Sequence, residues 1–143
     1  MKKIILGLLI FTAFTTSCSS DDDNGLAVTK QNLLGKWYLK GGTINNGAFE
    51  DYNHDCSISR DFQEFFDNDI LTFNGYNIDC ELNEVEESNW YLNGRVITVS
   101  IPNFMEYDIT VEKLTSNELI LKQDGINEDT GAVEDVSYYM TRN

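Results

Sequence analysis

The chain has 143 residues, and its 10 Lys and Arg against 24 Asp and Glu give a formal net charge of −14. This charge argues against a nucleic-acid partner, because phosphate binding requires the opposite sign. The length suits one domain with a single core, and one histidine with three cysteines leaves little material for metal or triad chemistry.

The first 17 residues have the layout of an export signal. Residues 1–3 are Met-Lys-Lys, and residues 4–14 carry no charge over a length too short to span a bilayer as a helix. Small residues then precede Cys18 in a stretch that resembles a lipobox, although Thr15 stands where most lipoboxes have Leu. We therefore expect cleavage before Cys18 and lipidation of this cysteine. The alternative is an ordinary secretory signal that happens to contain a cysteine.

Residues 18–30 are expected to form an acidic tether. Ser-Ser-Asp-Asp-Asp follows Cys18 directly, and such a segment stays solvated because like charges repel. A sorting role is the alternative, since serine followed by acidic residues is similar to surface-export signals of some Gram-negative lipoproteins. We expect the protein to associate with the membrane through the acyl chains on Cys18. The expected location is the outer membrane of a Gram-negative bacterium, on either face.

Residues 31–143 show mostly the period-two pattern of strands. Residues 36–41 predict a first strand, residues 69–76 predict another, and a further strand is an open alternative within residues 43–52. Between them, apolar side chains recur at helical spacing after Ser59, which could cap a helix. This spacing predicts a short amphipathic helix against one end of the sheet, carrying Ile58, Phe62, Phe65 and Phe66.

The second half of the chain predicts consecutive hairpins. Residues 84–92 and 95–101 flank Asn93-Gly94, and Asn-Gly tolerates the positive φ required at both centres of a type I′ turn. Residues 105–111 alternate strictly between apolar and polar side chains. Two more strands are expected at 118–122 and 135–142, separated by a long acidic loop. Seven strands, with an eighth left open, predict an all-β fold: a small antiparallel up-and-down barrel or a curled sheet.

Cys56 and Cys80 remain once Cys18 is assigned to lipid. In an oxidising envelope compartment they favour one structural disulfide over a metal or redox pair, because their spacing is too long for a CxxC motif and His54 is the only histidine. The acidic stretch 124–131 offers oxygen ligands for calcium, but Ile126 occupies a ligand position of the EF-hand series. We therefore expect no metal site, no cofactor and no catalytic residues, so the chain is not expected to be an enzyme.

Gly35-Lys36-Trp37 opens the first predicted strand with the Gly-x-Trp pattern of lipocalins. With this motif, Trp90 before a hairpin and Arg142 near the end, residues 31–143 resemble the lipocalin-like domain of small bacterial lipoproteins. The resemblance implies that Trp37 packs at the closed end of a barrel beneath Arg142, a cation–π contact of about 0.5–2 kcal/mol. The other lipocalin motifs are not evident and the chain is short, which leaves a filled or shallow barrel open.

Two functions follow as hypotheses. The first is a binding module whose barrel encloses a small hydrophobic ligand. The second is an envelope interaction or structural module with a filled barrel, which would meet an unspecified protein partner through the acidic loops 43–54 and 123–134. The residues expected to line the interior are Leu39, Leu71, Phe73, Leu92, Ile97, Val99, Tyr107, Ile109, Leu119, Leu121, Tyr138 and Met140.

Overall fold

The computed structural model describes residues 25–127 and 130–143. The expected signal peptide, Cys18 and residues 18–24 of the tether lie outside the described residues. The described chain forms one four-residue helix and nine strands: α1 (Lys30–Leu33), β1 (Gly35–Ile44), β2 (Glu50–Asp51), β3 (Phe62–Phe65), β4 (Ile70–Tyr76), β5 (Leu82–Asn93), β6 (Val96–Ile101), β7 (Met105–Leu114), β8 (Glu118–Ile126) and β9 (Val133–Thr141). Within it, no helix is both long and apolar enough to cross a bilayer.

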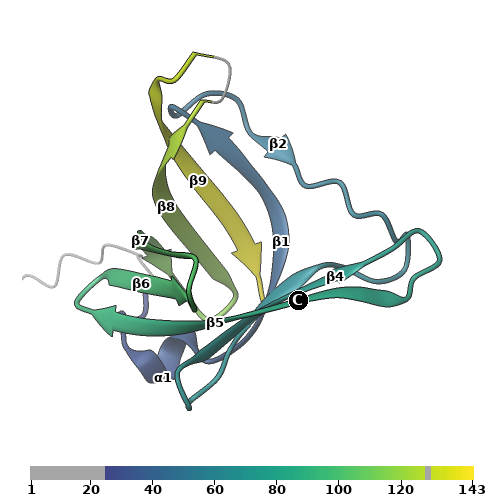
Figure 1. The fold of residues 1–143 in the computed structure, drawn as a ribbon, viewed down its shortest axis with the longest axis horizontal. Coiled ribbons are helices and arrows are strands. Elements are labelled where there is room, and N and C mark those ends of the chain that lie inside the picture. The colour runs from purple at the N-terminus through teal and green to yellow at the C-terminus, as the bar shows by residue number, and fades with distance from the viewer. Residues whose placement is uncertain (1–24, 128–129) are drawn as a thin grey trace, which may run out of the picture.

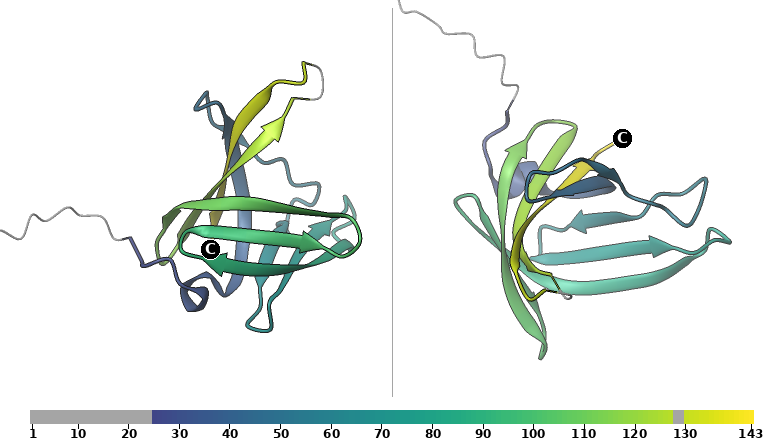
Figure 2. Two further views of the ribbon diagram at one scale, coloured as in Figure 1. Left: turned by 60° about the vertical axis from the view of Figure 1, so that its left-hand side comes forward. Right: turned by 90° about the horizontal axis from the view of Figure 1, so that it is seen from above.

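The strands form a closed antiparallel barrel, which confirms the predicted fold class. From β3 to β9 each strand pairs with the next one along the chain, and β1 pairs with both β3 and β9. Eight strands therefore complete the barrel, and the two-residue β2 pairs on the free upper part of the β1 edge. Figures 1 and 2 show α1 at the lower end of the barrel and the β8–β9 hairpin rising from the opposite end.

The lower end of the barrel holds the core. Its side chains come from inward positions of almost every strand, with Leu33 of α1 packed among them. Trp37 and Trp90 are both fully buried, and the Trp90 ring meets Phe65 edge-on with centroids 4.9 Å apart. Burying two such large rings supplies much of the apolar area that stabilises a domain of this size.

The predicted helix over residues 58–66 is wrong, because this segment contains strand β3. Phe65 faces inward onto Trp90, whereas Phe62 faces outward beneath Tyr38, at a centroid distance of 5.7 Å, and beneath the Lys36 ammonium at 4.3 Å. Both faces of β3 are therefore covered by other side chains, so aromatic residues occur on both faces, and their three-residue separation imitates helical spacing. Ile58 is exposed.

Ser59 is not a helix N-cap. Its backbone N–H donates to Cys56 Sγ at 3.0 Å in the turn that precedes β3. The helix that does form is α1, in which the Thr29 side chain accepts a hydrogen bond from the Asn32 N–H. The strand left open within residues 43–52 corresponds to β2, which lies outside the barrel's set of eight.

The predicted β5–β6 hairpin is confirmed, but its turn is not type I′. Asn93 pairs with Val96, so Gly94 and Arg95 occupy the two central positions. Gly94 has φ +61° whereas Arg95 does not have a positive φ, which is the pattern of a type II′ turn with glycine first. Two consecutive residues with positive φ, as a type I′ turn requires, occur instead at Asn45 and Asn46, directly after β1.

Several strands extend beyond their predicted ends. β8 continues to Ile126 and β9 begins at Val133, so half of the predicted acidic loop 123–134 is paired strand, with Gln123 opposite Val136. In β7 a register shift between Val111 and Lys113 changes which residues face inward. The strict alternation of residues 105–111 therefore ends at this bulge, and Leu114 is buried.

Candidate functional site

The upper part of the barrel is hollow. A cavity of about 600 Å³ lies above the core, within the range typical of small-molecule sites. Its wall is apolar toward the core and more polar toward the opening. The lining residues are Leu39, Gly41, Gly42, Thr43, Ile44, Ala48, Glu50, Asp51, Tyr52, Gln63, Phe73, Tyr107, Ile109, Leu121, Gln123, Val136, Tyr138 and Met140.

The twelve residues predicted to face the interior lie at two levels of the barrel, and Ile109, Leu121 and Met140 belong to both the packed core and the cavity wall. One group lines the cavity: Leu39, Phe73, Tyr107, Ile109, Leu121, Tyr138 and Met140. The other group belongs to the packed lower end or adjoins it: Leu71, Leu92, Ile97, Val99 and Leu119. The barrel is thus filled below and hollow above.

Several lining residues were missed in the sequence. Gln63 belongs to the segment predicted as a helix, and Gln123 belongs to the predicted acidic loop. Val136 lies in the predicted last strand but was not among the residues expected to face inward. Pairing supplies the signal that was lacking, because Gln63 lies opposite the inward Trp37 and Gln123 lies opposite Val136. Directly opposite residues on antiparallel strands share a face of the sheet.

Tyr107 and Tyr138 present hydroxyl groups to the cavity, in addition to those of Thr43 and Tyr52. Burial raises the pKa of Tyr107, and the nearby Tyr138 and Glu86 raise it further. Burial also raises the pKa of Tyr138. Both phenols are therefore neutral at physiological pH, and each presents an O–H that can donate to or accept from a bound molecule.

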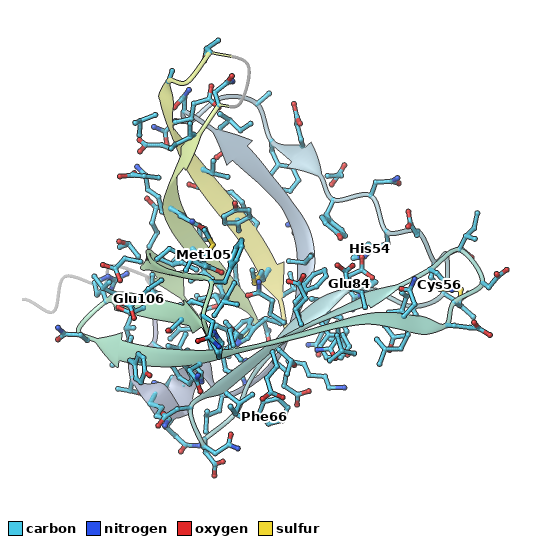
Figure 3. All side chains as sticks on the ribbon, in the orientation of Figure 1. His54, Cys56, Phe66, Glu84, Met105 and Glu106 are labelled. Atoms are coloured by element: carbon cyan, nitrogen blue, oxygen red, sulfur yellow. A yellow bond between two sulfur atoms is a disulfide. The ribbon has the colours of Figure 1, made fainter. Side chains whose placement is uncertain are left out.

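A second cavity of about 530 Å³ adjoins the first and shares Gln63, Phe73 and Tyr107 with it. Its remaining wall includes Glu86 and Glu87 of β5. Glu86 lies opposite Phe73, which places it on the inward face of the sheet. Glu84 lies further along the same β5 strand (Figure 3), and its charge contributes to the raised pKa of Tyr52.

A hydrogen-bonded segment closes the barrel wall beside β1. Buried Asp61 accepts from the Tyr52 hydroxyl at 2.8 Å and from the Tyr76 N–H at 2.8 Å. The Asp61 N–H donates to His54 Nδ1 at 3.0 Å, so the hydrogen on Nε2 can donate to the Leu39 carbonyl, 3.0 Å away. His54 therefore serves as a structural link between the segment and β1.

The pKa of Tyr52 is raised within this network. Desolvation and then the hydrogen bond to Asp61 raise its pKa to about 12. Its phenol remains protonated at physiological pH and continues to donate to the Asp61 carboxylate. The contact fixes Tyr52 where it contributes to the cavity wall.

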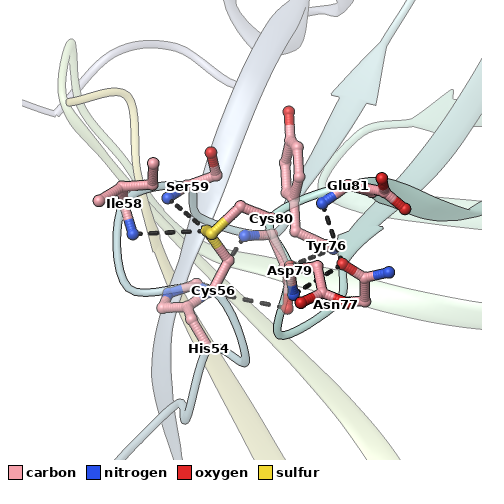
Figure 4. The surroundings of a disulfide bond; sticks show 10 residues. His54, Cys56, Ile58, Ser59, Tyr76, Asn77, Asp79, Cys80 and Glu81 are labelled. Carbon is pink, nitrogen blue, oxygen red and sulfur yellow. Dashed lines mark hydrogen bonds and ion pairs between the residues drawn. A yellow bond between two sulfur atoms is a disulfide. The ribbon is translucent and has the colours of Figure 1, made fainter.

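The predicted disulfide joins this segment to the β4–β5 turn (Figure 4). Cys56 and Cys80 have Cα atoms 4.9 Å apart, and Cys56 is buried. Cys56 Sγ also accepts backbone N–H groups from Ile58 and Ser59. The bond therefore connects a stretch with little regular structure to the β4–β5 hairpin of the barrel.

Arg142 closes the opposite end of the barrel. Its guanidinium lies 4.3 Å from the Trp37 ring centroid and donates to the Asn32 carbonyl at 2.6 Å. The Trp37 indole N–H donates to the Leu33 carbonyl at 2.8 Å. These contacts seal the lower end against α1, as the lipocalin resemblance implies, and leave the upper end for access.

The described residues provide no group of three or more His, Cys, Asp or Glu arranged to hold a metal ion. Residues 128 and 129 of the acidic stretch considered for calcium lie outside the described residues. The remainder of that stretch forms the end of β8 and its turn, where Asn127 Nδ2 donates to Glu134 Oε1.

Comparison with known proteins agrees with this architecture. A family model described as a lipocalin-like domain matches residues 33–121. Comparison with curated proteins returns no match. Among solved structures, apocrustacyanin C2 is 18% identical with a TM-score of 0.51, over 80% of this chain and 63% of that one.

An odorant-binding protein is 13% identical with a TM-score of 0.50, over 82% of this chain and 76% of that one. This chain thus spans less than two thirds of the apocrustacyanin, and identities this low establish the fold alone. The family model, however, covers more than half of the sequence. The chain belongs to the lipocalin-like domain family.

Proposed function

We propose that this domain binds a small hydrophobic molecule inside its barrel. The observation that carries the proposal is the cavity of about 600 Å³, which has an apolar floor formed by Leu39, Leu121 and Met140. Each CH₂ group of a ligand that leaves water for such a floor contributes about 0.8 kcal/mol. The tyrosine hydroxyls and glutamines nearer the opening would orient the polar end of the ligand.

The family and the fold support the proposal. Lipocalin-like barrels typically hold small hydrophobic ligands, and one of the similar structures is named an odorant-binding protein. The filled-barrel alternative requires the inward side chains to occupy the interior. A hollow of this size favours ligand binding over that alternative.

We also propose that the domain is held at the cell envelope by lipid on Cys18, most simply in the outer membrane of a Gram-negative bacterium. The support is the sequence around Cys18, together with a disulfide that suits an oxidising compartment. An anchored barrel would keep its ligand close to the membrane. No catalytic step is part of this proposal.

Titration with N-phenyl-1-naphthylamine, an uncharged dye that fluoresces in apolar surroundings, tests ligand binding. We expect saturable binding by the wild-type protein and at least tenfold weaker binding by Leu39→Trp, whose indole would project into the cavity. Tyr91→Trp is the matched control, because Tyr91 is exposed and does not line the cavity. Equal binding by the two variants, or none by the folded wild-type protein, would overturn the proposal.

A further inference from the structure

The charged residues around the cavity are all of one sign. Glu50 and Asp51 of β2 line its opening, and Glu86 and Glu87 of β5 line the adjoining cavity. We refer to these four residues as the acidic rim. The other polar groups of the main cavity are hydroxyls and amides, and no Lys or Arg is among the described residues that line it.

The basic side chains of the described chain are engaged elsewhere. Each lies against an aromatic ring, a carboxylate or a backbone carbonyl. The eight contacts are Lys30 with Asp69, Lys36 with Phe62, Lys40 with Phe49, Arg60 with Tyr38, Arg95 with the Glu112 carbonyl, Lys113 with Glu118, Lys122 with Asp135 and Arg142 with Trp37.

Lys122 lies in a lateral recess that shares Tyr107 and Gln123 with the cavity wall. Its ammonium is 3.0 Å from Asp135, and that hydrogen bond raises the pKa of Lys122. Asp108 and Asp124 line the same recess. The one ammonium of this recess is thus already balanced by carboxylates and is not available to a ligand anion.

This distribution of charge decides which polar end a ligand can carry. An ionised carboxylate entering the barrel would lose water without gaining a cation, and it would approach the acidic rim. An ammonium group at the opening would instead meet the carboxylates of Glu50 and Asp51, neither of which has an ion-pair partner within the described chain. An uncharged hydroxyl could bond to Tyr107, Tyr138 or the glutamines.

We propose that the cavity selects apolar molecules with a positively charged or uncharged polar end and discriminates against apolar carboxylates. This inference rests on the proposed binding function and specifies its ligand class. It concerns the end group alone, because the apolar floor accepts the same hydrocarbon chain in each case.

Displacement of bound N-phenyl-1-naphthylamine by three twelve-carbon ligands tests the inference. Dodecylammonium, dodecanol and dodecanoate share one chain and differ in charge at pH 7.5. We expect dodecanoate to bind at least tenfold more weakly than dodecylammonium at low salt, with dodecanol between them. The ratio should shrink when salt is raised from 20 to 500 mM, because ions screen exposed charges.

The double variant Glu50→Gln/Asp51→Asn should lose most of the preference for dodecylammonium while keeping its affinity for dodecanol. The matched control is Asp67→Asn/Glu112→Gln, which removes the same two charges from exposed positions outside the cavity wall. The control should retain the wild-type preference.

The outcomes separate the two proposals. Failure of the dye itself to bind refutes the binding function. Dye binding accompanied by equal or tighter binding of dodecanoate than of dodecylammonium refutes the charge selection alone. If both double variants reduce the preference equally, net charge rather than the acidic rim is responsible, which also overturns the inference.

Discussion

Removing the disulfide should destabilise the domain strongly, because this bond alone links the segment around Cys56 covalently to the β4–β5 turn. The cysteines are 24 positions apart in the sequence. On the chain-entropy model a closed loop of this size contributes about 3.5 kcal/mol by restricting the unfolded chain. Since Cys56 is buried and its Sγ accepts two backbone N–H groups, replacing both cysteines by alanine should cost about 3–5 kcal/mol.

Urea unfolding of the oxidised wild-type protein, the reduced wild-type protein and Cys56→Ala/Cys80→Ala measures this cost. The reduced protein keeps both sulfur atoms, so its difference from the oxidised form isolates the cross-link. We expect a steeper dependence on urea after the bond is lost, because the unfolded chain then exposes more surface. The thermal midpoint should fall by about 10–20 °C.

A difference below about 1 kcal/mol between the oxidised and reduced proteins would refute this reasoning. Such a result would mean that the hydrogen bonds of Asp61 to Tyr52 and Tyr76 restrict the segment around Cys56 as much as the disulfide does, in the partly unfolded chain as well as in the folded one.

Three further predictions concern the closed end, the Tyr52 network and the anchor. Arg142→Met should lower the free energy of unfolding by about 1–3 kcal/mol, because it removes the cation–π contact with Trp37 and the hydrogen bond to the Asn32 carbonyl. Arg60→Met loses a contact with Tyr38 and an exposed hydrogen bond to the Asn143 carbonyl, and it should cost less in the same thermal melts. The folded protein holds the Tyr52 proton with a pKa of about 12, against about 10 for an exposed tyrosine. The stability of the wild-type protein should therefore fall between pH 10 and 12, and that of Tyr52→Phe should fall less steeply over this range. Identical pH slopes in chemical denaturation would contradict the assigned network. Cys18→Ser should be folded and recovered in the soluble fraction after signal cleavage, whereas persistent membrane attachment in a fractionation experiment would refute the lipid anchor.

The strands were predictable wherever one face is buried and the other is wet. Residues 105–111 illustrate this, because Ile109 and Val111 are buried while Asp108 and Thr110 are exposed. The same rule failed at β3, whose outer face is covered by Tyr38 and Lys36. Apolar and polar residues alternate along a strand only when one of its faces is buried. When both faces are covered, the alternation that identifies a strand in the sequence is lost.

The extent of the cavity could not be predicted in the same way. Alternation indicates that Leu119 and Leu121 both point inward, but only Leu121 reaches the hollow part. Which inward residues meet across the barrel depends on strand register, and the register includes bulges such as the one after Val111.

The Asp61 network was equally invisible in the sequence. Asp61 is one of 24 acidic residues, and nothing local distinguishes it. It is bonded to Tyr52 and Tyr76, which lie 9 and 15 positions away in the sequence and meet it only through the folded chain. Cys56 and Cys80 were easier to assign, because counting cysteines in an oxidising compartment leaves a single pair.

The central claim is that the upper barrel is a ligand site, and a crystal structure of the oxidised protein grown with N-phenyl-1-naphthylamine tests it most directly. The account predicts electron density for the dye enclosed by Leu39, Phe73 and Tyr138, with the packed core below it unchanged. A barrel whose side chains fill this space, with the dye absent or bound only to the outer surface, would contradict the account.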